Sequence, residues 1–170
     1  MFLTGRQLAK LAYEVGGFRG ADLLYAVRIM LGESGGNTVA THRNTDSRRT
    51  LDRGLWQFND YWFRDKRKPT DPLYVSDTAA FDPYTSTLKA RAVWQAQGRT
   101  FAPSWGRKWH PEKDAAARKA IAAYLGAPYA SALPPRNDGG APVGAIVLGI
   151  AAGAAVAWWI RDRTRGKSRR

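Results

Sequence analysis

Hydrophobic residues recur at helical spacing in four parts of the chain. Thr4 is a residue type that caps helices, and the Leu, Ala and Val residues that follow it share one helix face up to the glycine pair at 16–17. Residues 21–32 are mostly apolar, which predicts a central, buried helix. Two more helices are predicted over residues 85–97 and over residues 111–125, where a proline opens the helix and a glycine follows it.

The stretch between the second and third predicted helices has a different pattern. Residues 38–58 are polar with β-branched residues among them, which is unfavourable for a helix and predicts a small β-hairpin. Asp-Pro pairs at 71–72 and 82–83 indicate turns. The expected fold class is therefore α+β, mainly α.

An uncharged run of 18 residues, 143–160, dominates the C-terminal part. As a helix it would be about 27 Å long, close to the ~30 Å of a bilayer core, and a Trp pair at 158–159 precedes a basic segment. We therefore expect a transmembrane helix, with a buried core helix as the alternative. Its G-x-x-x-G step, at 149–153, is compatible with a homo-oligomer. Residues from 127 onward are rich in Pro and Gly, as linkers often are. The expected organisation is a domain over 1–130, a linker over 131–142, the span over 143–160 and a basic tail over 161–170.

Composition narrows the possible chemistry. A chain of 170 residues with 44% hydrophobic residues fits one folded domain and argues against global disorder. Zero cysteines exclude a disulfide scaffold and a thiol nucleophile, and two histidines are too few to indicate a metal site. The net charge is +13, and the last ten residues hold six Lys or Arg and one Asp, which leaves +8 upstream. The tail is suited to contact with anionic lipid or DNA.

Glu33 falls at the predicted end of the apolar helix. Ala26, Ile29 and Met30 precede it at spacings that place them on the same helix face. A carboxyl group beside apolar side chains is partly desolvated, and the negative end of the helix dipole adds to this, so both effects favour the neutral form. Such an acid is suited to protonate a glycosidic oxygen. A glutamate at a helix end is also commonly just solvated.

The residues around Glu33 form a specific combination. Residues 33–46 read ESGGNTVATHRNTD and residues 52–59 read DRGLWQFN. This resembles the lysozyme superfamily, in which lytic transglycosylases carry an E-S pair and a G-L-x-Q segment, and chicken-type lysozymes carry A-T-x-R-N-T-D, an Asp and G-x-x-Q-x-N. The animal enzymes have disulfides that this chain lacks, which favours the bacterial or phage branch. The resemblance implies a mainly helical lysozyme-like domain with a small β-hairpin beside a cleft.

The resemblance also implies roles for individual residues. Glu33 matches the catalytic acid, and Asp52 matches the second carboxylate, although the chain is two residues longer before it. A well-placed Asp52 allows hydrolysis; otherwise the substrate's own acetamido and 6-hydroxyl groups complete a transglycosylase reaction, and both remain open. The matched substrate-binding residues are Asn44, Gln57, Asn59 and Trp62. Turn formation is the alternative for Asn44, Gln57 and Asn59, and burial in the core is the alternative for Trp62.

The expected function is cleavage of the β-1,4 bond between N-acetylmuramic acid and N-acetylglucosamine in peptidoglycan, with no cofactor or metal. Arg6 and Lys10 interrupt the early apolar stretch, so no secretory signal is recognised. Together with the span, this predicts a single-pass membrane protein of a phage virion, which opens the wall during genome entry. A lysis protein of the host membrane and a catalytically inactive, membrane-anchored peptidoglycan-binding module remain alternatives.

Overall fold

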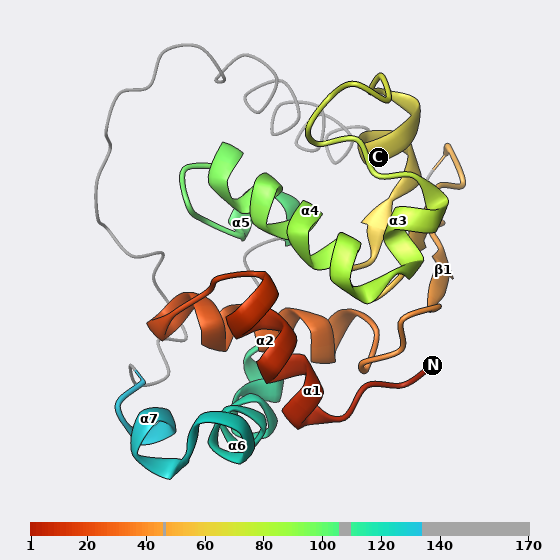
Figure 1. The fold of residues 1–170 in the computed structure, drawn as a ribbon. Helices are drawn as coiled ribbons and strands as arrows, with labels where there is room; N and C mark the ends of the chain where they lie inside the picture. The colour runs from red at the N-terminus through yellow and green to blue at the C-terminus, as the bar shows by residue number, and fades with distance from the viewer. Residues whose placement is uncertain (46, 106–109, 134–170) are drawn as a thin grey trace, which may run out of the picture.

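Helix α2 (Gly20–Glu33) lies between two groups of helices in the computed structural model, which describes residues 1–45, 47–105 and 110–133 (Figure 1). Helices α6 and α7 lie on one side of it, and α4 and α5 lie on the other, with a small sheet beside α3. Helix α1 packs against α6 and α2. The other elements are α1 (Gly5–Lys10), η1 (Leu11–Val15), β1 (Thr41–Arg43), β2 (Leu51–Arg53), β3 (Phe58–Asn59), η2 (Tyr61–Asp65), α3 (Asp77–Phe81), α4 (Pro83–Ala96), α5 (Ala102–Trp105), η3 (Pro111–Lys113), α6 (Asp114–Leu125) and α7 (Ala127–Ser131).

The four predicted helices are confirmed, with small shifts at their ends. The first continues from α1 into the π-helical η1 and ends before the glycine pair at 16–17. The second is α2, the third is α4, and the fourth is η3 followed by α6. The segments η2, α3 and α5 were not predicted, because each has only four or five residues and so shows no helical period.

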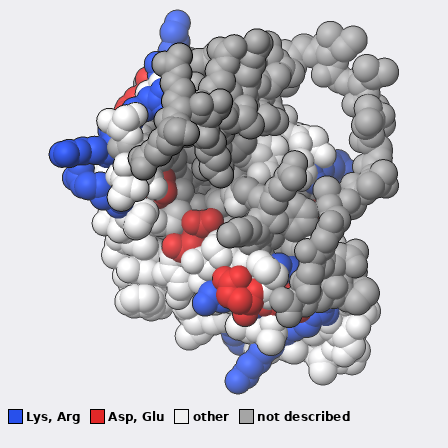
Figure 2. All heavy atoms as spheres, turned by 180° about the vertical axis from the view of Figure 1, so that it is seen from behind, with Lys and Arg blue, Asp and Glu red and all other residues white. Residues whose placement is uncertain are grey.

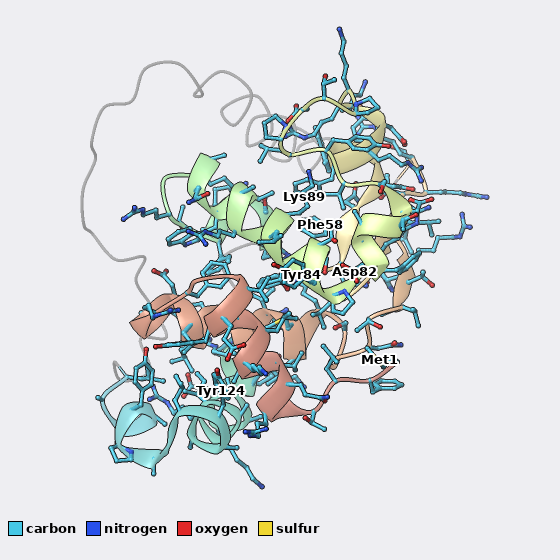
Figure 3. All side chains as sticks on the ribbon, viewed as in Figure 1. Met1, Phe58, Asp82, Tyr84, Lys89 and Tyr124 are labelled. Atoms are coloured by element: carbon cyan, nitrogen blue, oxygen red, sulfur yellow. The ribbon has the colours of Figure 1, made fainter. Side chains whose placement is uncertain are left out.

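Side-chain caps fix where several of these helices begin. Thr4 and Gln7 form a reciprocal capping box at the start of α1. Ser76 accepts a hydrogen bond from a backbone N–H of the first turn of α3. Asp82 does the same for α4, whose first residue is Pro83 (Figure 3). These caps set the entry of α3 and α4 beside the sheet.

The predicted hairpin is part of a larger sheet. Strands β1 and β2 pair antiparallel with His42 opposite Asp52, and β3 pairs with the other side of β2 so that Asn59 is also opposite Asp52. The strand order is β1-β2-β3. Phe58 points from β3 into the interior, where 3% of its surface is exposed (Figure 3). The central strand therefore holds Asp52 between two neighbouring strands.

An aromatic cluster fills the core between α2, α4 and α5. Phe18 and Trp56 are 1% and 0% exposed. The ring centroid of Phe18 lies 5.3 Å from that of Phe101 and 5.5 Å from that of Trp94, and Trp56 lies 5.6 Å from Trp105. Aromatic pairs at these distances and tilted angles stabilise a core beyond their buried area. The cluster holds the residues around Trp56 in a fixed position next to the end of α2.

A short helix that was not predicted lies at the C-terminal end of the predicted domain. Residues from 127 onward have the composition of a linker, yet Ala127–Ser131 form α7, which packs on α6 and buries Ala130. The linker-like composition was therefore misleading for these first residues, because an apolar face can be buried even in a short, proline-containing segment. The predicted span over 143–160 and the tail over 161–170 lie outside the described residues. In the part of the chain that the structure describes, no helix has both the length and the apolarity to cross a membrane.

Candidate active site

Glu33 is the last residue of α2, and its side chain is 26% exposed. Its Oε1 lies 3.1 Å from Nε2 of His110, which comes from the segment before η3. The close approach depends on the preceding residue, Gly32, because a Cβ atom there would lie 1.9 Å from the His110 ring. Glu33 is thus half-buried against a histidine 77 positions further along the chain.

Ser34 ties the end of α2 to the segment before β3. Its hydroxyl lies 3.0 Å from the carbonyl oxygen of Met30 and 2.9 Å from that of Leu55. The same oxygen accepts a hydrogen bond from the backbone N–H of Gly36. Because Ser34 follows Glu33 directly, these bonds fix the backbone that carries the Glu33 side chain.

The segment 54–57 is itself held from several sides. Gly54 has a φ of +75°, and a Cβ there would lie 1.8 Å from the carbonyl oxygen of Ala80, so only glycine fits. The indole N–H of Trp56 donates to Thr87 at 3.0 Å, and its carbonyl oxygen accepts from the Trp105 indole N–H at 2.8 Å. The G-L-W-Q string therefore joins α2, α4 and α5 at one point.

Asp52 lies on the central strand and is a half-buried residue. The side-chain amide of Asn59 donates to Asp52 Oδ1 at 2.7 Å and lies 2.9 Å from the Thr50 hydroxyl. Asn44 donates to the same hydroxyl at 3.1 Å. Asn59 Oδ1 is buried and has no hydrogen-bond partner among the described residues. Asn59 thus joins Asp52 to the Thr50 hydroxyl, and Asn44 reaches the same group through its own bond to Thr50.

Gln57 contacts backbone groups of the sheet and its turn. Its side-chain N–H groups donate to the carbonyl oxygens of Ala40 and Gly54, at 3.2 Å and 2.8 Å. Its own backbone has a φ of +49°, which a non-glycine residue rarely adopts. Through these contacts the Gln57 side chain binds backbone groups and stabilises the turn. Its predicted contact with substrate stays a prediction.

Trp62 lies on η2, next to the sheet, and is partly exposed. Its ring meets the Tyr61 ring edge-on with the centroids 4.9 Å apart. Arg48 and Lys66 place their charges 4.5 Å and 5.0 Å from the Tyr61 centroid. The expected alternative of a fully buried Trp62 does not hold, because part of its surface is accessible. Whether Trp62 stacks on a sugar stays a prediction.

His110 is a site residue that the sequence reasoning missed. Its backbone is left-handed, with a φ of +44°, and its carbonyl oxygen accepts a hydrogen bond from Nε of the buried Arg28. Its second ring nitrogen, Nδ1, lies 3.2 Å from the Glu112 carboxylate. A lone histidine before a proline has no motif around it, so only the three-dimensional contact with Glu33 identifies it.

A family model described as lysozyme like domain matches residues 9–106 of the chain. This is more than half of the chain. The chain belongs to the lysozyme-like domain family. A solved structure of a lysozyme from Litopenaeus vannamei is similar at 20% identity, covering 81% of this chain and 92% of that chain with a TM-score of 0.38. No curated protein matches the chain.

The match confirms the resemblance that the E-S and G-L-W-Q strings indicated. All the predicted site residues of the lysozyme-like domain lie inside the matched range, whereas His110 and Glu112 lie beyond its end. Acidic side chains gather near the middle of the face seen in Figure 2, and Lys and Arg lie toward its edges. Among the described residues, no group of three His, Cys, Asp or Glu side chains could hold a metal ion.

Proposed function

We propose that the lysozyme-like domain cleaves the β-1,4 bond between N-acetylmuramic acid and N-acetylglucosamine in peptidoglycan, with Glu33 as the proton donor. The observation that carries the proposal is the position of Glu33. It stands half-buried at the end of a central helix whose following residue is bonded to Leu55. A carboxyl group held in this way keeps one orientation toward a bound sugar chain.

In the proposed reaction, the Glu33 carboxyl group gives its proton to the glycosidic oxygen as the bond to the sugar C1 breaks. The sugar left behind has oxocarbenium character, which the Asp52 carboxylate stabilises by charge or by covalent capture. Asn59 donates to Asp52 and so keeps that carboxylate in one orientation. Either water or the substrate's 6-hydroxyl group then bonds to C1, which breaks the C1–Asp52 bond where one has formed and releases the Asp52 carboxylate, and the proton of the incoming group passes to the Glu33 carboxylate. The first route is hydrolysis, and the second gives the anhydro product of a lytic transglycosylase.

The remaining predicted residues would bind the sugar chain. Trp62 offers a partly exposed aromatic face to the C–H groups of a sugar ring. Asn59 lies on the same sheet as Asp52, Asn44 directly follows β1, and Gln57 lies in the turn that connects β2 to β3. We expect the basic surface to bring the domain to anionic cell walls, an attraction that weakens at high salt.

The biological setting is part of the proposal. We propose a membrane-anchored phage protein for wall penetration during genome entry, held by the 143–160 span, with the tail toward DNA or anionic lipid. The rival is a lysis protein in the host membrane. Finding the protein in purified virions supports the first setting, and finding it only in the host membrane supports the second.

The test of the chemistry is Glu33→Gln, which keeps the shape of the side chain and removes the proton to be donated. We expect the full-length variant to lose at least about 10²-fold of the activity on purified peptidoglycan, the usual scale of general acid catalysis. Glu14→Gln is the matched control, because it makes the same change at a surface carboxylate bonded to Tyr124. Wild-type rates from Glu33→Gln would overturn the proposal.

A wild-type protein that binds peptidoglycan without releasing any sugar ends would point instead to the inactive binding module. Mass spectrometry of the released muropeptides distinguishes the two chemical routes, because the anhydro product lacks one water relative to the hydrolysed sugar. The release of sugar ends and the masses of the muropeptides can be measured in the same digests, so one experiment shows whether the protein cleaves peptidoglycan and by which route.

A further inference from the structure

The Glu33–His110 contact joins the proposed acid to a part of the chain outside the family match. The side chains of both residues are 26% exposed, so the contact between Nε2 and Oε1 is partly shielded from water. His110 Nδ1 faces the Glu112 carboxylate at 3.2 Å, while the Glu112 side chain is 58% exposed. The histidine ring therefore lies between two carboxyl groups in different surroundings.

The backbone of His110 is anchored by a buried charge network. Arg28, on α2 and 5% exposed, donates from Nε to the His110 carbonyl oxygen at 3.2 Å. Its guanidinium also lies 3.4 Å from Asp114 on α6, and Asp114 accepts from Arg118 at 2.7 Å. Because Arg28 is on the same helix as Glu33, this network sets the His110 ring at a fixed place relative to the Glu33 carboxyl group. Gly32 leaves the space that the ring occupies.

The two partners of the ring determine where its protons lie. A hydrogen bond from its own backbone N–H, and then the side chain of His110, hold the pKa of Glu112 below its usual value. An ionised carboxylate only accepts hydrogen bonds, so the Nδ1 facing Glu112 must carry a proton. The proton between Nε2 and Oε1 is therefore shared: while it is on Glu33 the ring is neutral and Nε2 accepts, and while it is on Nε2 the ring is a cation beside the Glu33 carboxylate.

We propose that His110 is a positioning residue for Glu33, with which it shares one proton, and that Glu112 sets the histidine tautomer that leaves this proton available on Glu33. The inference rests on the proposed function of Glu33 as the acid. In its singly protonated state the pair holds a proton that Glu33 delivers to the glycosidic oxygen. When the leaving sugar has taken it, the proton that water or the 6-hydroxyl group releases returns to the same pair.

The charged groups around the pair are consistent with this role. Lys113, on η3 next to Glu112, is the neighbouring cation there, and Arg28 faces the His110 backbone from α2. The Arg28 charge is compensated by Asp114 from α6. Because two groups in hydrogen-bonding contact exchange protons as a unit, replacing His110 removes the partner of the Glu33 carboxyl group, and the pH dependence of kcat is the readout of that loss.

The test follows the alkaline limb of the pH dependence of kcat for full-length protein on purified peptidoglycan, from about pH 4 to about pH 9. His110→Gln should move this limb to lower pH by about one unit or more, so activity on the alkaline side falls about tenfold or more. KM should change less than kcat, since His110 acts through Glu33. Lys119→Ala, an exposed change on α6, is the control and should keep the wild-type limb.

Glu112 provides a second, independent arm that does not depend on the fold tolerating a change at His110. Glu112→Ala removes the acceptor at Nδ1, so the ring can place its proton on Nε2 and the limb should again move to lower pH. Glu112→Gln keeps an acceptor oxygen and should restore the wild-type limb. Nitrogen NMR of the imidazole ring gives a readout without activity: Nδ1 protonated in wild type, and Nε2 protonated in Glu112→Ala.

The outcomes separate the two proposals. An inactive Glu33→Gln together with an unmoved limb in His110→Gln would overturn the role of His110 and leave Glu33 as the acid. An unchanged tautomer in Glu112→Ala would likewise overturn the role of Glu112. An active Glu33→Gln would remove the basis of both proposals.

Discussion

The buried ion pair between Arg28 and Asp114 should be a main contributor to stability. The Arg28 side chain is 5% exposed and that of Asp114 is 12% exposed, and their charged atoms lie 3.4 Å apart. Asp114→Asn removes the negative charge with almost no change of shape and leaves a buried guanidinium without that carboxylate. Breaking one side of a buried pair costs about 3–5 kcal/mol. We expect about 3 kcal/mol here, because the Asn oxygen still accepts a hydrogen bond.

The measurements are urea unfolding, which gives the free energy, and thermal unfolding, which gives Tm, each followed by tryptophan fluorescence and circular dichroism. For a domain of this size, a loss of about 3 kcal/mol corresponds to a Tm lower by roughly 10 °C. The control is Asp65→Asn, which breaks the Arg64–Asp65 pair; its atoms are closer, at 2.8 Å, but both side chains are much more exposed. We expect that change to cost less than about 0.5 kcal/mol.

A double-mutant cycle isolates the pair itself. Arg28→Met and the double variant with Asp114→Asn complete the cycle, and we expect a coupling energy of about 2 kcal/mol. The coupling should be favourable because the double variant no longer buries an arginine charge. A coupling near zero, or an Asp114→Asn variant as stable as Asp65→Asn, would refute the reasoning from burial.

Two further predictions concern the turn before β3 and the cap of α4. Gly54→Ala should lose at least about 2 kcal/mol of stability and most activity, because its Cβ meets the Ala80 carbonyl oxygen. Its control is Gly98→Ala, which has a similar φ of +72° but open space around the Cβ and should lose only about 1 kcal/mol. Thermal unfolding measures both losses of stability. Hydrogen bonds from the Thr85 hydroxyl and then its backbone N–H lower the pKa of Asp82 below 3.8, so its carboxylate stabilises the fold above that pH and the effect fades as pH falls through the lowered value. Asp82→Asn keeps a cap without this titration, so unfolding measured against pH should show the difference between the two proteins shrinking at low pH; a constant difference would contradict the assignment.

Local sequence was sufficient for much of the fold. The long helices carry three or more turns of apolar periodicity, and their ends carry Thr4 and Asp82 caps, so local propensity and burial agree. A strand was expected over the G-L-W-Q-F-N segment, but only Phe58–Asn59 form one, because its extent is set by pairing with β2. Helix α7 was missed for a similar reason, because its packing on α6 stabilises it.

In the candidate site, too, some residues were indicated by the sequence and other contacts were seen only in the structure. The E-S and G-L-W-Q strings indicated Glu33 and the family, because a short turn with a required glycine leaves a recognisable local pattern. The structure added that Gln57 holds backbone groups of the turn, which a family resemblance does not reveal.

By itself, the sequence determined the helical class, the lysozyme-like family and the carboxyl group at the end of α2. These depend on periodicity and on strings of neighbouring residues, which are local properties of the chain. Only the tertiary structure decided the surroundings of Glu33: the Ser34 bond to Leu55 and the His110 ring beside it. Such contacts join residues 21 and 77 positions apart, and chain folding, rather than any local pattern, brings them within hydrogen-bonding distance.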